Sequence, residues 1–175
     1  MRNNFSNIIL IGMAGAGKST VGAVLASLAE KQFIDTDDLI SEQTGMALQD
    51  FLNSVGREMF QHREEETLLS ITLRDHVIAT GGSAVYSSAG MKHLQKLGPI
   101  ILLEVDLEIL EQRVHNKDSR GLINPGEGSF RDLFYSRQPL YRRWADIRIN
   151  GFGPPEDIAR SILKKLTETK NSRLN

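Results

Sequence analysis

The residues best suited to chemistry lie in a glycine-rich run near the start of the chain. Residues 12–19 read GMAGAGKS and fit the pattern G-x-x-x-x-G-K-[ST], in which glycines let the backbone wrap around a phosphate group. Successive backbone N–H groups then face the anion. Lys18 supplies a charge for the outer phosphates, and the Ser19 hydroxyl can bind Mg²⁺. The run therefore predicts a site for ATP and Mg²⁺.

The context of this run decides between two interpretations. A glycine-rich turn before an ordinary helix is the alternative to a phosphate-binding loop. An apolar, strand-like stretch precedes the run and a helical pattern follows it, which favours the phosphate-binding loop. The candidate ATP-binding residues here are Gly12, Ala14, Gly15, Ala16, Gly17, Lys18, Ser19 and Thr20, although helix packing accounts better for the Thr20 side chain.

Three acids follow the next short apolar run. Asp35, Asp37 and Asp38 come at the end of a predicted strand over 32–35. A small-molecule kinase needs one carboxylate near magnesium and another near the acceptor hydroxyl. The alternative is N-capping of the following helix, where acids are favoured, and we assign Asp38 to that cap. Given the phosphate loop, we favour functional roles for Asp35 and Asp37.

The elements that must position these residues alternate between strand and helix. This order predicts an α/β fold in three layers, with helices on both faces of a parallel sheet. Loops at the carboxyl ends of the strands then gather along one edge, where chemistry collects. We predict strands at 7–11, 32–35, 76–80, 100–105 and 145–149, and helices at 18–31, 38–44, 48–53, 57–73, 87–97, 107–114, 130–144 (interrupted by Pro139) and 156–170.

Composition excludes several classes of protein. The 175 residues suit one domain over 1–170, with a mobile lid at about 116–129 and a disordered tail at 171–175. A net charge of −1 gives no basic field for nucleic acid or membranes, and no apolar run is long enough for a span. The absence of cysteine excludes thiolate chemistry. We expect a cytoplasmic monomer whose partner is a small-molecule substrate.

Beyond the phosphate loop, residues 8–166 resemble the shikimate kinase family. The matching pieces are the phosphate loop, Ile34-Asp35-Thr36-Asp37, residues 56–64 and 80–85, Arg113, Arg120 and the run RQPLYRR at 137–143. Their order and spacing carry the resemblance. It implies a P-loop fold of the nucleoside monophosphate kinase type with a five-stranded parallel sheet. It also implies phosphoryl transfer from ATP to shikimate, giving shikimate 3-phosphate, a reaction of aromatic amino acid biosynthesis.

The resemblance also implies roles for single residues. Asp35 would help hold Mg²⁺ together with Ser19, and Asp37 would bind the acceptor hydroxyls and take the proton from the attacking one. Catalysis would rest on Asp37, Lys18 and the lid residue Arg120, which would also bind ATP. Arg113 would stack on the adenine, or else simply pair with Glu108 or Glu111 on its own helix. Substrate binding would fall to Asp37, Gly81, Gly82, Arg137 and the residue at position 61.

Three departures from the family pattern bear on the acceptor. Gln61 stands where the family has a carboxylate-binding Arg, and Arg57 lies one helical turn earlier as a possible substitute. Ser83 replaces a glycine, which would strain the backbone if positive φ were needed or crowd the substrate if close approach were needed. Gly121 replaces a proline in the lid. We assign residues 62–66 to a solvated helix face, with Glu64 as the exception because the family places an acid there.

These departures leave the acceptor open. The first reading is a shikimate kinase with a rebuilt carboxylate site, and the second is a paralogue that phosphorylates another small polyol or sugar acid of the gluconate type. A non-catalytic ATP-binding module is a further alternative. The intact Lys18, Ser19, Asp35 and Asp37 disfavour it.

Overall fold

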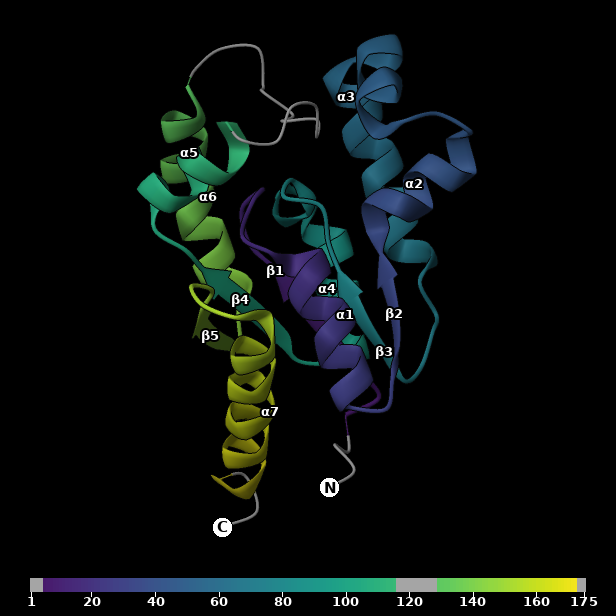
Figure 1. Cartoon of the computed structure of the whole chain (residues 1–175). Helices are drawn as coiled ribbons and strands as arrows, with labels where there is room; N and C mark the ends of the chain where they lie inside the picture. The colour runs from purple at the N-terminus through teal and green to yellow at the C-terminus, as the bar shows by residue number, and fades with distance from the viewer. Residues whose placement is uncertain (1–4, 116–128, 173–175) are drawn as a thin grey trace.

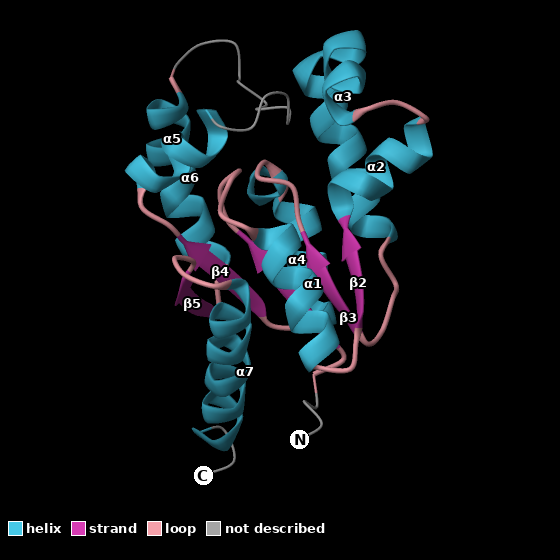
Figure 2. Cartoon of the chain, viewed as in Figure 1, coloured by secondary structure: helices cyan, strands magenta, loops and turns pink. Residues whose placement is uncertain are grey.

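The computed structural model describes residues 5–115 and 129–172, which form a five-stranded sheet between helices (Figures 1 and 2). Neighbouring strands are all parallel, in the order β2-β3-β1-β4-β5, which confirms the predicted α/β fold. The strands are β1 (Asn7–Ile11), β2 (Gln32–Asp35), β3 (His76–Ala79), β4 (Ile100–Glu104) and β5 (Ile147–Asn150). The helices are α1 (Lys18–Leu28), α2 (Thr36–Thr44), α3 (Leu48–Ser70), α4 (Ser88–Leu97), α5 (Leu107–His115), α6 (Phe130–Trp144) and α7 (Pro155–Ser172), with the short 3₁₀ helix η1 (Ala84–Tyr86).

The sheet forms because its central strands are covered on both faces. All residues of β1 and β3 are buried, as the continuous apolar run of β1 predicts for a parallel strand inside an α/β protein. Helices α1 and α7 pack side by side on one face. Helix α4 packs on β1 and α6 on β4 across the other face, and α3 packs on α4. Right-handed crossovers then bring the loops after β1, β2 and β3 to one edge of the sheet.

The start of α2 differs from the prediction. Asp35, not Asp38, is the N-cap of α2, and its Oδ1 accepts a hydrogen bond of 3.0 Å from the Asp37 backbone N–H. Asp38 lies inside the first turn, where a negative charge suits the positive end of the helix. The helix therefore starts at Thr36, directly after β2, and Asp37 is its second residue.

Other boundaries move by a few residues. The predicted helices at 48–53 and 57–73 join as α3, with a break at Gly56, whose φ of 78° and ψ of 172° are not helical. Helix α6 runs through Pro139 without the expected interruption, and α7 reaches Ser172, two residues into the predicted tail. No helix in the described part of the chain is long and apolar enough to span a membrane.

Candidate active site

The loop between β1 and α1 has the backbone of an anion site. Gly12, Gly15 and Gly17 have φ values of 146°, 82° and 93°, which side-chain-bearing residues rarely adopt. Gly17 is also the N-cap of α1 and has no side chain to accept the first N–H groups of that helix. Those N–H groups and the positive end of the helix are left for a ligand, which suits a phosphate chain.

Lys18 lies inside this loop. Its Nζ donates to the backbone carbonyl oxygens of Gly12 at 2.7 Å and Met13 at 2.9 Å. Burial lowers the pKa of Lys18 to about 8, partly opposed by the negative charges of Asp37 and Asp35. The site therefore holds a desolvated ammonium group whose carbonyl partners a phosphate oxygen can replace.

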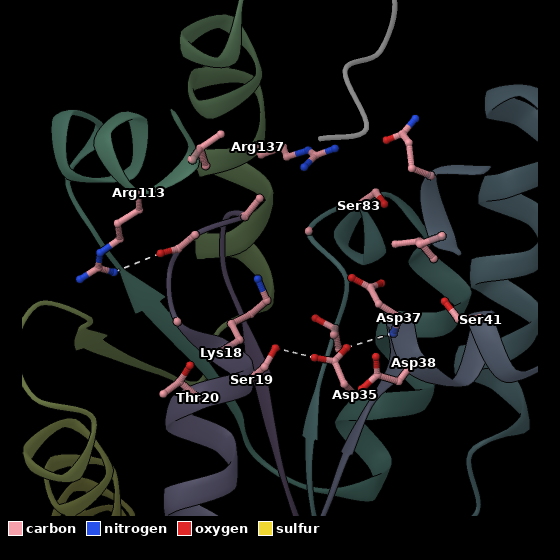
Figure 3. Close-up of a pocket in the computed structure, with 18 of the residues that line it drawn as sticks. Lys18, Ser19, Thr20, Asp35, Asp37, Asp38, Ser41, Ser83, Arg113 and Arg137 are labelled. Atoms are coloured by element: carbon pink, nitrogen blue, oxygen red, sulfur yellow. Dashed lines mark hydrogen bonds between the residues drawn. The ribbon is translucent and has the colours of Figure 1, made fainter. Parts of the chain in front are cut away.

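A hydroxyl and a carboxylate meet beside Lys18 (Figure 3). Ser19 Oγ donates to Asp35 Oδ2 at 2.6 Å, while the other oxygen of Asp35 caps α2. Oxygen ligands of this kind fit Mg²⁺, which proteins hold through one or two carboxylates together with substrate phosphates. Among the described residues, no group of three or more His, Cys, Asp or Glu could hold a metal ion by itself. The pair therefore fits an ion that is shared with a nucleotide.

Asp37 faces the same space from the start of α2. Burial, together with the charge of Asp35, raises the pKa of its carboxyl to about 6, and the charge of Lys18 opposes the shift. Its Oδ1 lies only 2.6 Å from the position that a Cβ at Gly81 would occupy. Gly81 thus leaves room for Asp37, while its own N–H donates to Thr36 Oγ1 at 3.0 Å and is already used within the protein.

Arg137 comes from α6 and is almost completely buried. Its guanidinium lies 5.3 Å from the Tyr86 ring centroid, and its Nε donates to the Tyr86 hydroxyl at 3.3 Å. A Cβ at Gly82 would lie 3.0 Å from Arg137 Nη1. Tyr141, one turn along α6, donates to the Gly82 carbonyl oxygen at 2.7 Å and so fixes this loop against α6. A buried cation is thereby held next to Gly82.

Glu64 is the residue that the sequence pattern placed least well. His62 and Glu66 are exposed and paired, as a solvated helix face predicts. Glu64, on the same helix, is only 3% exposed and accepts a 2.9 Å hydrogen bond from Ser83 Oγ. Burial raises the pKa of Glu64 to about 7. The break at Gly56 and the buried Phe60, one turn before Glu64, mark the inward face that would have identified it.

The Ser83 backbone is not strained. Its φ of −89° and ψ of −11° lie in the right-handed region that any residue adopts. A serine at this position therefore causes no backbone strain, which was one of the two problems expected from replacing the family's glycine. The side chain is buried and turned onto Glu64.

Two predicted residues lie at the margins. Arg113 Nη1 donates to the Gly15 carbonyl oxygen at 3.1 Å and so lies against the phosphate loop. Of its expected alternative partners, Glu111 pairs with Arg131 instead. Gln61 is half-buried on α3, one turn before Glu64, and Arg57 is exposed.

The phosphate loop, Asp35, Asp37, Ser83, Arg113 and Arg137 line one cavity of about 540 Å³. Figure 3 shows Lys18, Asp37, Ser83 and Arg137 around it. Of the predicted site residues, Ala14, Gly15, Gly17, Lys18, Ser19, Thr20, Asp35, Asp37, Gly82, Arg113 and Arg137 line the cavity, while Gly12, Ala16, Gly81 and Gln61 are not among its lining residues. Arg120, Gly121 and most of the predicted lid lie outside the described residues.

Comparison with known proteins finds relatives of one kinase family over nearly the whole chain. A family model described as shikimate kinase matches residues 14–167. Shikimate kinase from Nitrosospira multiformis is 36% identical, with 92% of this chain and 85% of the relative covered. The relative from Thermodesulfovibrio yellowstonii is 35% identical, with 95% and 98% covered.

Comparison with solved structures finds the same family. The structure of Acinetobacter baumannii shikimate kinase in complex with shikimate superposes with a TM-score of 0.89 at 32% identity, covering 96% of both chains. A gluconokinase from Sinorhizobium meliloti, at 19% identity and a TM-score of 0.56, shares the fold alone. With its phosphate loop, its paired acids and its buried arginine in place, this chain belongs to the shikimate kinase family.

Proposed function

We propose that this chain transfers the terminal phosphoryl group of ATP to a hydroxyl of shikimate. The observation that carries the proposal is the convergence of Lys18, Asp37 and Arg137 on one cavity, from three separate elements, in a chain of this family. The cavity has an anion-binding loop at one end and a buried guanidinium at the other. An ATP phosphate chain and a hydroxy acid match these two ends.

At the nucleotide end, the backbone N–H groups at the start of α1 and the Lys18 ammonium would bind the ATP phosphates. Ser19 and Asp35 would hold Mg²⁺, which supplies charge neutralisation of the phosphates when bound. Arg113 lies near enough to the phosphate loop to bind the nucleotide beyond its phosphates. Arg120 remains our candidate for a cation that joins the phosphates from the lid.

At the acceptor end, the Asp37 carboxylate would accept a hydrogen bond from the reacting hydroxyl and take its proton as the O–P bond forms. A pKa near 6 suits this role, because the carboxyl is ionised at neutral pH yet more basic than a solvated aspartate. Arg137 would pair with the acceptor's carboxylate, since a guanidinium offers two parallel donors. Gly82 allows this close approach.

The test is an assay of ADP release with shikimate, quinate, gluconate and nucleoside monophosphates as acceptors, with and without Mg²⁺. Turnover that is selective for shikimate and lost on chelation is the expected result. Selective turnover of gluconate would show that gluconate, and not shikimate, is the acceptor. Binding of ATP without turnover of any acceptor would identify a non-catalytic module and refute the proposal.

The proposal includes a cytoplasmic monomer without nucleic-acid partners. The near-zero net charge argues against a general nucleic-acid surface. One cavity holds both candidate ends of the reaction within a single chain. Light scattering after size exclusion tests the monomer, which a mass of twice 19.5 kDa would contradict.

A further inference from the structure

The contact between Glu64 and Ser83 has no place in the roles above. Both side chains are buried, at 3% and 2% exposure, and Ser83 lines the cavity. The Ser83 hydroxyl donates to Glu64 Oε1 at 2.9 Å. Among the described residues, Glu64 forms no ion pair with a lysine, arginine or histidine. A buried carboxylate without an ion-pair partner is costly, so its charge needs further compensation.

The surroundings of Glu64 identify where its charge acts. On α2, Asp37 Oδ1 lies 2.6 Å from the Cβ position at Gly81, and Glu64 Oε1 lies 2.7 Å from that same point. From α6, Arg137 Nη1 approaches Gly82, and both Arg137 and Tyr141 interact electrostatically with Glu64. Two carboxylates therefore lie together at the acceptor end, and Arg137 must balance them as well as any incoming carboxylate.

The hydrogen bond between Ser83 and Glu64 can run in either direction. While Glu64 is ionised, the serine hydroxyl must donate to it and can offer the cavity only an acceptor. Once Glu64 carries a proton, Glu64 can donate to Ser83 Oγ instead. The serine hydrogen is then free to point into the cavity as a donor. The same protonation removes a negative charge from the neighbourhood of Arg137.

We propose that Ser83 and Glu64 form a proton-dependent contact for the carboxylate of the acceptor, in which protonated Glu64 frees the Ser83 hydroxyl to donate to that carboxylate. This inference rests on the proposed function, because it assigns a contact within the same acceptor site. Ser83 is a binding residue in this scheme, and Glu64 is a positioning residue that acts through it. The neutral Gln61 elsewhere on α3 brings no compensating cation, so the proton takes that place.

The burial of Glu64 also supports this scheme, because it favours the protonated carboxyl. Burial, together with the charge of Asp37, raises the pKa of Glu64 to about 7, against the opposing effects of the Ser83 hydrogen bond and Arg137. Glu64 is then mostly ionised at pH 8 in the free protein and takes up a proton when the acceptor binds. Below pH 6 it is already protonated, so Glu64 takes up no proton on binding.

The experiment is calorimetry of shikimate binding to the full chain in two buffers of different ionisation enthalpy, which measures proton uptake directly. At about pH 8 we expect wild type to take up close to one proton per bound shikimate. Glu64→Gln keeps a neutral donor next to Ser83, so it should bind at about pH 8 without this uptake. At about pH 5.5 the two proteins should exchange equal numbers of protons, because Glu64 is already protonated and Asp37 titrates in both. Glu58→Gln, an exposed change on the same helix, should behave as wild type.

Ser83→Ala tests the other half of the contact. At about pH 5.5 it should weaken shikimate binding about tenfold, the loss expected for a hydrogen bond to a charged group, and leave ATP binding unchanged. A serine that only fastens its loop to α3 would instead lower the melting temperature without this selective loss. Equal proton uptake at about pH 8 in wild type and Glu64→Gln would overturn the inference, as would unaltered shikimate binding at about pH 5.5 in Ser83→Ala.

These outcomes separate the inference from the function. Turnover of shikimate without proton uptake overturns the inference and leaves the function standing. Proton-linked binding of shikimate without turnover overturns the function and leaves the contact standing. Shikimate that neither binds nor reacts overturns both.

Discussion

The two ends of the cavity are built in different ways. The phosphate end is one contiguous segment, in which three glycines and the start of α1 create the site from backbone N–H groups. The acceptor end combines side chains from α2, α3, α6 and the loop after β3, namely Asp37, Glu64, Arg137 and Ser83. Substitutions should therefore act broadly at the first end and selectively at the second.

The largest effect is expected for Lys18→Ala. In the proposed mechanism the Lys18 ammonium balances the charge of the transferred phosphoryl group, so its removal should lower kcat at least about 1000-fold. It should not unfold the chain, because the change removes a buried charge whose lowered pKa shows that folding disfavours its protonated form. Steady-state kinetics and thermal melting check both parts, with the exposed Lys92→Ala as control. Retained turnover would refute the role of Lys18.

Arg137→Lys should affect the acceptor selectively. Lysine keeps the charge but loses the planar fork and its contact with Tyr86, so KM for shikimate should rise about 30-fold while KM for ATP stays unchanged. The matched control is Arg142→Lys, an exposed position on the same helix. Equal increases in both KM values would show that Arg137 serves the fold of the site and not the acceptor.

Gln61→Arg should sharpen the acceptor end by adding the missing cation. A guanidinium one turn before Glu64 could pair with that carboxylate and with shikimate, so KM for shikimate should fall about five- to tenfold. His62→Arg adds a cation to the neighbouring exposed position and should have no such effect. An unchanged KM in Gln61→Arg would mean that Gln61 does not weaken carboxylate binding.

The smallest effect is on stability. Because folding raises the pKa of Glu64 from 4.5 to about 7, the folded state binds its proton more tightly. Wild type therefore loses stability as pH rises through this interval. Glu64→Gln removes that loss and should gain about 2 kcal/mol over wild type at about pH 8, but little at about pH 4. Denaturant unfolding at both pH values measures it; a gain independent of pH would contradict the assignment.

The sequence predicted best the part of the site whose function depends on local backbone geometry. The spacing of Gly12, Gly17 and Lys18 predicts the loop, because glycine freedom and a following helix need no distant partner. The alternation of apolar runs and helical patterns predicts the parallel sheet, and family membership confirms the kinase. These features follow from short stretches of chain.

The side-chain contacts of the site depended on tertiary packing. Asp35 became both the cap of α2 and the partner of Ser19 because the end of β2 lies beside the start of α1. Glu64 lies on the inward face of α3 with Phe60 and Leu68, at helical spacing, but the charged residues around it hid that face in the sequence. Its partner Ser83 lies 19 residues away. Contacts between distant segments exist only after the sheet has brought their loops to one edge, so the sequence could name those residues but not pair them.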